Sequence, residues 1–510
     1  MLTSILFVYS LIIKAWIEIL GAFLTVYDLV IRGGRVGSIE GVVPMDVAIR
    51  GEEIVAVGRD LPRGAQEIDA TDKLVLPGGV DAHCHIEQLS GGGIMNADTF
   101  ETATRSAAFG GTTTTISFAA QHRGDSLDAV VANYTALAER GALTDFAFHL
   151  WISDPGRETL ERDLPRLIEL GHRSIKVFMT YDNVRLLDEQ VLDVMAVARQ
   201  HGALVCAHAE NHGMIKWMAD RLIARGYTAP KYHAVSHPRG SEAEAFERLI
   251  RFSELLDQPI VLFHVSTAEG AAIIRRARGD GIKVFAETCP QYLFMTAQDM
   301  DRSGLEGAKW MCSPPPRDKA DQEALWRALE LGDLQMVSSD HAPYRHDATG
   351  KLSAGPDSTF KQIANGLPGL ETRLPLMFDA MVSQGRSSIE SFVRLTATAP
   401  AQIYGLHPKK GAIAVGADAD IAIWDPDRNV TITDEGMHDN AGYTPFAGRV
   451  VRGWPETVLR RGAVIVSGGV IHARPGSGQI QLRPPSRSMQ PSGTPSPEFD
   501  PTRNFGAQLG

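Results

Sequence analysis

Apolar, β-rich runs alternate with helical stretches through the middle of the chain, and this alternation limits the possible folds more than any other feature. A helical stretch such as Leu187–Gly202 separates one β-rich run from the next. Eight runs are expected to form strands: Leu74–His85, Thr112–Phe118, Phe146–Ile152, Ser174–Met179, Ala203–His208, Ile260–Val265, Lys283–Thr288 and Leu334–Asp340. Repeated β/α units predict an α/β protein, here a (β/α)8 TIM-like barrel with insertions. A doubly wound sheet is the competing architecture.

Short strands with glycine-containing turns are expected on both sides of this region. Residues 27–75 begin with alternating apolar positions (DLVIRGGRV, then DVAIRGEEIVAVG), and residues 406–474 contain similar stretches at Gly411–Trp424 and Arg460–Ile471. Such alternation is typical of half-buried antiparallel strands. Neither stretch is long enough to bury a core alone, so we expect one small β-sandwich built from both chain ends. The barrel would then occupy residues 76–405.

The two terminal segments differ from the rest of the chain. Residues 1–26 are strongly apolar, but Lys14 and Glu18 interrupt the run, which falls short of the ~20 apolar residues of a membrane span. This N-terminal extension has three interpretations: a start codon assigned too early, an accessory helix or partner surface, or an anchor or signal, the last being least favoured. Residues 475–510 are rich in Pro, Ser, Gly and Gln. That composition predicts a flexible tail or a strap on a neighbouring subunit.

Charge and cysteine content exclude some classes of protein. The chain has 50 Lys and Arg against 61 Asp and Glu, a net charge of −11. A nucleic-acid binder would need a basic surface to neutralise phosphates, so no nucleic-acid partner is expected. The four cysteines are far apart and show no CxxC spacing, so they do not form a disulfide scaffold. A reduced, cytoplasmic setting is expected.

Polar residues at the predicted strand ends suggest a metal site, because barrel enzymes place their chemistry at the C-terminal ends of the strands. An HxH pair ends the first strand, and side chains at i and i+2 share a strand face. Buried Lys and Asp are rare unless they are paired or bound to a metal. The candidate ligands are His83, His85, Lys176, His208, His264 and Asp340.

Lys176 requires a chemical change before it can bind a metal, because a protonated amine has no lone pair and its ordinary pKa is about 10.4. Addition of CO2 would convert the amine to a carbamate, an anionic group whose two oxygens can bridge two cations. Imidazole and oxygen ligands suit Zn²⁺, with Co, Mn or Ni as alternatives. The set therefore predicts two divalent ions, most simply Zn²⁺, as in hydrolytic sites with two metals.

Seven short motifs together resemble one known family. VDAHCH, SIKVFMTY, CAHAEN, LFHVST, ETCPQYL, CSPPPR and SSDHAPY are similar to motifs of the dihydropyrimidinase/D-hydantoinase family of cyclic amidohydrolases, within the amidohydrolase superfamily. The resemblance extends from Asp28 to Arg474. It implies a barrel with a β-sandwich, two Zn²⁺ ions bridged by carboxylated Lys176, and hydrolysis of cyclic amides.

The resemblance also implies a role for each ligand. His83 and His85 would bind the more buried metal together with Asp340, and His208 and His264 would bind the second. A hydroxide bridging the metals would open dihydropyrimidine or 5-substituted hydantoin rings to N-carbamoyl amino acids. Asp340 would take the proton of this hydroxide and deliver it to the departing ring nitrogen, as general base and then general acid.

Three further residues match positions that contact substrate in the family. Tyr181 would direct its phenol at the oxyanion that develops on the attacked carbonyl. Ser313 and Asn365 would hold the imide edge of the ring through their backbone groups. The substrate would be a small cyclic amide or ureide, and the enzyme a homo-oligomer, a tetramer or a dimer.

Some alternatives remain within and beyond this family. Dihydroorotases have an Arg two positions after the second His, whereas this chain has Glu87, whose carboxylate would repel an acidic substrate. Allantoinase and cyclic imide hydrolase remain alternatives because their metal sites are similar. Non-catalytic assembly proteins of this fold lack metal ligands, and the presence of all six candidates disfavours that function.

The remaining candidates receive structural interpretations. Cys84 points away from its neighbouring histidines and is expected to pack in the core, and His341 is expected to support Asp340 from outside the site. The glycine-rich run Ser90–Phe100 is expected to form a mobile loop beside the ring substituent. Other histidines are interpreted as surface or supporting residues: His122, His149, His172, His201, His212 and His233.

Overall fold

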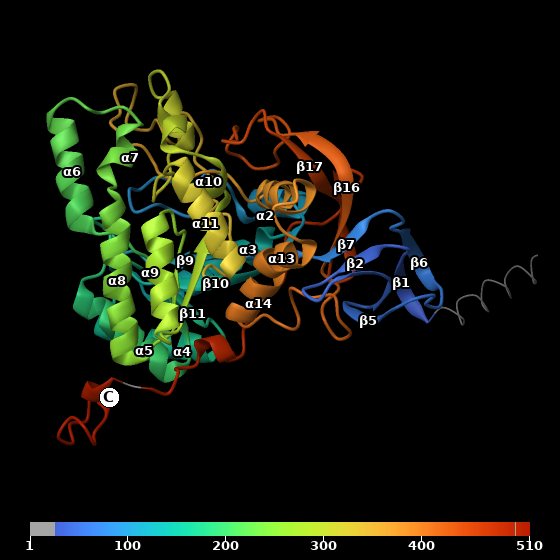
Figure 1. Cartoon of the computed structure of the whole chain (residues 1–510), viewed down its shortest axis with the longest axis horizontal. Coiled ribbons are helices and arrows are strands. Elements are labelled where there is room, and N and C mark those ends of the chain that lie inside the picture. Colours follow the sequence, from blue (N-terminus) through green and yellow to red (C-terminus); the bar gives the residue numbers. More distant parts are fainter. Residues whose placement is uncertain (1–25, 495, 510) are drawn as a thin grey trace, which may run out of the picture.

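The computed structural model describes residues 26–494 and 496–509 and places a barrel of parallel strands at the centre (Figure 1). The strands are hydrogen-bonded in the order β15-β14-β13-β12-β11-β10-β9-β8, and a parallel bridge between Cys84 and His341 nearly closes the sheet. This circular order confirms the predicted barrel and excludes a doubly wound sheet. The strands are β8 (Gly79–Asp81), β9 (Thr112–Ala120), β10 (Asp145–Trp151), β11 (Ser174–Phe178), β12 (Leu204–His208), β13 (Ile260–Leu262), β14 (Val284–Thr288) and β15 (Met336–Val337).

Helices cover the outside of the barrel (Figure 1). One of them, α11 (Lys319–Leu331), is capped at both ends: the Asp318 side chain accepts hydrogen bonds from the backbone N–H groups of Ala320 and Asp321, and Gly332 ends the helix in the left-handed conformation. An additional pair, α6 (His212–Ala224) and α7 (Tyr232–Ser236), follows β12. The covering helices are α2 (Phe100–Phe109), α3 (Leu127–Gly141), α4 (Leu164–Glu169), α5 (Asp188–His201), α8 (Arg239–Leu256), α9 (Ala268–Gly279), α10 (Pro290–Phe294), α11 (Lys319–Leu331), α12 (Arg373–Phe378), α13 (Ile389–Val393) and α14 (Ala399–Ile403).

The predicted strand Leu74–His85 is divided between two sheets, which corrects its expected extent. β7 (Leu74–Pro77) pairs with strands of the small domain, and only β8 belongs to the barrel. Gly78 lies at the crossing, where a Cβ atom would be 2.3 Å from Oγ1 of Thr113, so the close approach of the two chain segments requires glycine. As a result, both histidines of the HxH motif follow the strand instead of ending it.

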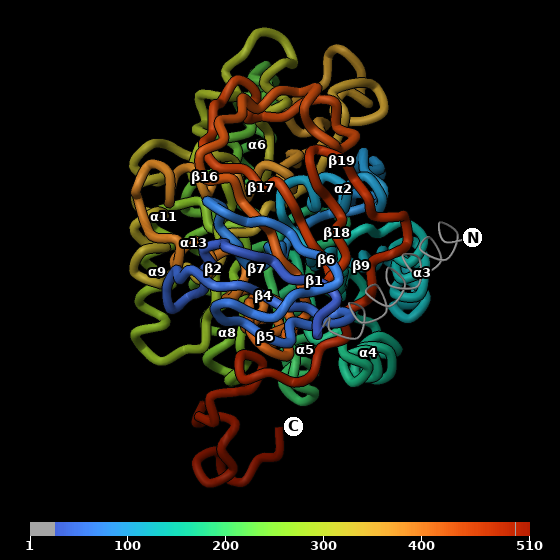
Figure 2. Tube along the Cα trace, turned by 90° about the vertical axis from the view of Figure 1, so that its right-hand side faces the viewer, coloured from blue at the N-terminus to red at the C-terminus, as the bar shows by residue number. Residues whose placement is uncertain are grey.

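Two facing sheets form the small domain, in the orders β5-β4-β1-β6 and β19-β18-β17-β16-β7-β2-β3 (Figure 2). Apolar side chains of both sheets, such as Ile49 and Ile423, are buried in one shared cluster. Strands from both chain ends therefore form the sandwich, as predicted. They are β1 (Tyr27–Arg32), β2 (Arg35–Gly37), β3 (Val42–Pro44), β4 (Asp46–Arg50), β5 (Glu53–Gly58), β6 (Gly64–Asp69), β16 (Ile421–Thr431), β17 (Val450–Arg460), β18 (Ala463–Ser467) and β19 (Val470–Ile471).

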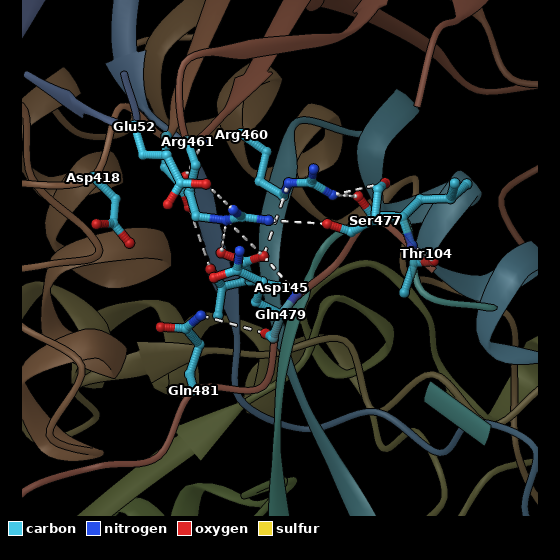
Figure 3. A network of polar contacts seen from close by, with 12 residues as sticks. Glu52, Thr104, Asp145, Asp418, Arg460, Arg461, Ser477, Gln479 and Gln481 are labelled. Atoms are coloured by element: carbon cyan, nitrogen blue, oxygen red, sulfur yellow. Dashed lines mark hydrogen bonds and ion pairs between the residues drawn. The ribbon is translucent and has the colours of Figure 1, made fainter. Parts of the chain in front are cut away.

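A buried network of charges joins the barrel to the small domain (Figure 3). Asp145, at the start of β10, accepts hydrogen bonds from Nε of Arg461 (3.0 Å) and Nζ of Lys410 (2.5 Å). Lys410 also lies 2.9 Å from carboxylate oxygens of both Asp418 and Asp420. Paired charges of this kind can be buried because each finds a partner of opposite sign.

The segment after residue 475 differs from the predicted flexible tail. Its residues 476–492 pack on the end of the barrel where the strands begin, and in Figure 1 part of this red segment lies beside α4. The backbone of Gln479 and Gln481 bonds to Phe146, and the buried guanidinium of Arg483 donates to Oγ of Ser174 (2.9 Å) and the carbonyl of Phe148 (2.8 Å). The amino-acid composition of this segment predicted mobility. Composition alone does not reveal tertiary hydrogen bonds such as those of Arg483.

Residues 1–25 of the predicted N-terminal extension, 1–26, lie outside the described residues. Across residues 26–494 and 496–509, no helix combines the length and the apolar character needed to cross a bilayer.

Candidate metal centre and substrate cavity

A cavity of about 660 Å³ opens at the end of the barrel where the strands finish. All of the site residues predicted from the sequence line this cavity. They come from five strands or the loops after them and from two longer connecting segments. They are His83, His85, Lys176, Tyr181, His208, His264, Ser313, Asp340 and Asn365.

His83, His85 and Asp340 converge closely enough to hold one ion. Nε2 of His83 lies 3.1 Å from Oδ1 of Asp340, and Nε2 of His85 lies 3.4 Å from the same oxygen. One potential ligand atom from each residue falls within 4.8 Å of the other two. Two imidazoles and a carboxylate at such spacing form a ligand set suited to a divalent transition metal.

His208, His264 and Lys176 lie beside this trio. The ring centroids of His208 and His264 are 4.5 Å apart, and those of His83 and His264 are 5.5 Å apart. The fully buried amine of Lys176 lies among aromatic rings, 4.2 Å from the centroid of Phe263 and 4.5 Å from that of Phe178. Burial lowers the pKa of this amine to about 7, so a large fraction is uncharged near neutral pH.

Three side chains that the sequence analysis missed hold the outer nitrogens of the histidines. Glu287 contacts Nδ1 of His83, Gln88 lies 2.8 Å from Nδ1 of His85, and Glu210 lies 2.9 Å from Nε2 of His208. Metal-binding histidines usually have one ring nitrogen fixed in this way, which leaves the other nitrogen free for the metal. This arrangement fits a metal site and supplies the supporting acceptors that such a site needs.

Two of these three residues had a signal in the sequence. Glu210 follows His208 by two positions, and Glu287 is an acid inside the apolar run Lys283–Thr288. Buried carboxylates of that kind call for a partner. Gln88 had no comparable signal.

Comparison with known proteins agrees with this geometry. The sequence profile of the Amidohydrolase family matches residues 74–465. A D-hydantoinase from Rhizobium radiobacter is 40% identical over 457 residues, which cover 89% of this chain and 99% of that protein. A D-hydantoinase from Streptomyces coelicolor is 41% identical over 461 residues, covering 89% of this chain and 97% of that protein.

The chain belongs to the amidohydrolase family. Within it, the chain groups with hydantoinases and dihydropyrimidinases, which confirms the resemblance drawn from the seven motifs. The crystal structure of a dihydropyrimidinase from Brevibacillus agri superposes with a TM-score of 0.87 at 39% identity, covering 90% of this chain and 99% of that one.

Three of the candidate metal-binding imidazoles of this amidohydrolase are held in the uncharged form that a metal ligand requires. Burial lowers the pKa of His208, and lowers those of His83 and His264 well below the ordinary value. Among the described residues, none forms a hydrogen bond with the buried Nδ1 of His264. A buried ring nitrogen without a partner is costly, and this cost is consistent with a ligand that completes the site.

Three site residues of the amidohydrolase have left-handed backbone conformations, which residues other than glycine rarely adopt. The φ angles are 74° at Tyr181, 41° at His264 and 49° at Asp340. Strain of this kind persists only where surrounding structure enforces it, and it is concentrated at functional sites. It also prevents β13 and β15 from continuing through His264 and Asp340, where the sequence predicted strand.

Ser313 and Asn365, the two residues predicted to contact substrate through their backbone, have backbone groups that are available for hydrogen bonding. Among the described residues, none forms a hydrogen bond with the backbone N–H or C=O of either. Adjacent carbonyls are occupied: Cys312 accepts from Nε2 of His233 (2.9 Å) and Pro314 accepts from the hydroxyl of Tyr292 (2.9 Å). The two residues expected to face substrate therefore keep free backbone groups although neighbouring carbonyls are occupied.

Among the residues given structural interpretations, His149, His341 and Cys84 are buried, and His212 and His233 line the cavity. His233 holds Cys312, and His149 is buried in the barrel between Ala82 and Ser174. Nε2 of His341 pairs with Asp98 at 2.8 Å, and the Cys84 side chain is buried in the core.

His237, which the sequence analysis did not consider, lines the cavity and donates to Glu210 through Nδ1.

Glu87 does not act as predicted. Its backbone is left-handed (φ 49°), and its carboxylate accepts the N–H of Phe100 at the start of α2. Glu87 is not among the residues that line the cavity. The chain still lacks the arginine that is typical of dihydroorotases. Glu87, however, is not placed to repel an acidic substrate in the cavity.

Proposed function

We propose that this amidohydrolase opens a dihydropyrimidine or a 5-substituted hydantoin by hydrolysing a ring C–N bond, which yields an N-carbamoyl amino acid. The observation that supports this most strongly is the shared cavity, which collects every residue inferred from the family motifs. The names of the relatives, D-hydantoinase and dihydropyrimidinase, describe the same reaction class.

Two divalent ions, most simply Zn²⁺, belong to this proposal. His83, His85 and Asp340 would hold one, and His208 and His264 the other, with carboxylated Lys176 shared between them. The uncharged amine of Lys176 supports the carbamate, since only a free amine adds CO2. When bound, such ions lower the pKa of water towards 7 and polarise a carbonyl.

Asp340 acts as the proton carrier in this proposal. Its carboxylate takes a proton from the attacking water and then transfers it to the ring nitrogen as the C–N bond breaks. The water oxygen ends in the new carboxylate, and the nitrogen leaves as a neutral amide. The left-handed turn at Asp340 directs its side chain into the cavity, beside the histidines after β8.

Tyr181 stabilises negative charge on the attacked carbonyl oxygen in this proposal. Burial, assisted by the charge of Glu210, raises the pKa of the phenol well above its ordinary value. The hydroxyl therefore stays protonated and can donate a hydrogen bond. Its ring lies 5.2 Å from that of His208, at the centre of the candidate site.

The free backbone groups of Ser313 and Asn365 hold the imide edge of the ring, which contains the scissile C–N bond. An imide presents alternating carbonyl and N–H groups, and a backbone offers the matching donors and acceptors. The small cyclic substrate would thus be oriented with its scissile bond towards Asp340.

A homo-oligomer, tetramer or dimer, is also proposed. Trp217 (54% exposed) and Val235 (48% exposed) present apolar surface on α6 and α7, which a second copy could cover. Sedimentation equilibrium would test this; a monomer at all concentrations would contradict it.

The deciding experiment is a side-by-side assay of dihydrouracil and a 5-monosubstituted hydantoin with purified, Zn-loaded protein, and Asp340→Ala as the control. Opening of either ring, lost in the variant, supports the proposal, and the ratio of the two rates separates dihydropyrimidinase from hydantoinase character. No opening, with two metals bound per chain, contradicts it and redirects the assay to allantoin and cyclic imides. No opening and no bound metal points to a non-catalytic protein.

A further inference from the structure

A second buried lysine lies next to the cavity and has no role in the chemistry above. Lys351 is fully buried (0% exposed), and its Nζ donates to the carbonyl oxygens of Ala364 (2.8 Å) and Met311 (3.3 Å). No carboxylate among the described residues lies close enough to form an ion pair with it. Burial without a counter-ion lowers the pKa of Lys351 to about 7.

The two carbonyls belong to the two segments that are expected to bind substrate. Met311 lies two residues before Ser313, and Ala364 directly precedes Asn365. The N–H of Gly366 also donates to the Met311 carbonyl, at 3.0 Å, so the segments already touch. Lys351 therefore bridges the two segments within two residues of the groups that are expected to bind the ring.

The contact with Ala364 has a second consequence. The Ala364 carbonyl and the Asn365 N–H are two ends of one peptide group. A donor on the carbonyl polarises the peptide and strengthens the N–H as a donor, because hydrogen bonds in a chain reinforce one another. This N–H has no partner among the described residues.

We propose that Lys351 is a positioning residue that clamps segments 311–313 and 364–366 together and directs the free backbone groups of Ser313 and Asn365 at the substrate ring. This inference rests on the proposed function, in which those groups bind the imide edge. A merely structural role would be served better by an apolar side chain, because burying an amine without a counter-ion destabilises the fold.

The test compares Lys351→Met, which keeps length but removes the donors, with Lys351→Gln, which keeps an N–H donor. Lys319→Met, at an exposed lysine on α11, is the matched control. The clamp should contribute equally to ground-state and transition-state binding. Lys351→Met is therefore expected to raise KM about 10- to 100-fold with kcat within about threefold. Lys351→Gln should recover part of the loss, and Lys319→Met should match the native enzyme.

A native KM in Lys351→Met would overturn the proposal. So would a loss of kcat that is accompanied by loss of bound metal, since that result means general disruption of the site. Activity of the native enzyme in the same assay shows separately whether the proposed function holds.

Amide hydrogen exchange provides a measurement that does not depend on turnover. Lys351→Met should exchange faster than the native protein within residues 311–313 and 364–366, and Lys319→Met should not. Unchanged exchange in those segments rules out the clamp even if no ring is opened. Should Lys351→Met fail to fold, the same comparison is made with Lys351→Gln, for which a smaller increase is expected.

Discussion

Tyr181 shows how one residue in the site combines a strained backbone with a specific chemical task. Tyr181→Phe removes only the hydroxyl and keeps the ring that packs near His208. Loss of one donor to a developing oxyanion typically costs about 100- to 1,000-fold in kcat, and we expect a decrease of that size with little change in KM. Steady-state kinetics on the better of the two ring substrates measures it.

Tyr227→Phe is the matched control, because Tyr227 is exposed and is not among the residues lining the cavity. If Tyr181→Phe retains native kcat, the phenol has no part in stabilising the oxyanion.

Glu210 illustrates how a residue outside the ligand set can decide the strength of a metal site. Its two carboxylate oxygens hold His208 and His237, each at 2.9 Å. Glu210→Gln replaces one acceptor oxygen with a donor, so one imidazole loses its fixed orientation. We expect zinc affinity to fall about 10- to 100-fold, as measured by competition with a chelator.

Glu254→Gln provides the comparison for this change, because Glu254 forms only a surface pair with Arg251. Equal zinc affinity in the native protein and in Glu210→Gln would show that His208 does not depend on this carboxylate.

At the level of elements, the C-terminal residues 476–492 cover the end of the barrel where the strands begin. Arg483 is 2% exposed, and its guanidinium donates to Ser174 on β11 and to Phe148 on β10. Arg483→Met removes charged hydrogen bonds and leaves the acceptors buried. We expect the free energy of unfolding to fall by about 2 kcal/mol or more in urea titration.

Arg474→Met serves as the reference substitution, since Arg474 is exposed just before this segment. A stability of Arg483→Met indistinguishable from that of Arg474→Met would mean that the segment is not anchored through its arginine.

At the scale of the whole molecule, the charge network around Asp145 links three parts of the chain that are distant in sequence. Lys410→Met removes the cation that faces Asp145, Asp418 and Asp420 (Figure 3 shows Asp145 with its other partners). Removal of one partner from a buried ion pair costs about 3–5 kcal/mol, so we expect a clearly lower Tm in calorimetry.

The neighbouring Lys409→Met tests the same chemical change at an exposed position and should leave Tm unaltered. Equal Tm values for the two variants would show that the network does not stabilise the junction between barrel and sandwich.

Much of the fold was already determined by local sequence. The alternation of β-rich and helical stretches predicted the barrel, and period-two apolar patterns at both ends predicted the sandwich, because side-chain periodicity directly encodes which face is buried. The HxH motif and the polar residues at strand ends identified six candidate metal ligands that line the cavity, and the family resemblance added Tyr181, Ser313 and Asn365. These patterns are short, so a single sequence suffices to recognise them.

Only the tertiary structure decided which distant groups meet. Glu287 supports His83 across 204 positions of sequence, Glu87 turns away from the cavity, and Arg483 enters the base of the barrel. No local pattern encodes such pairs, because they depend on how strands are staggered and where loops turn. Left-handed turns at His264 and Asp340 belong to the same class, since surrounding packing rather than residue preference holds them.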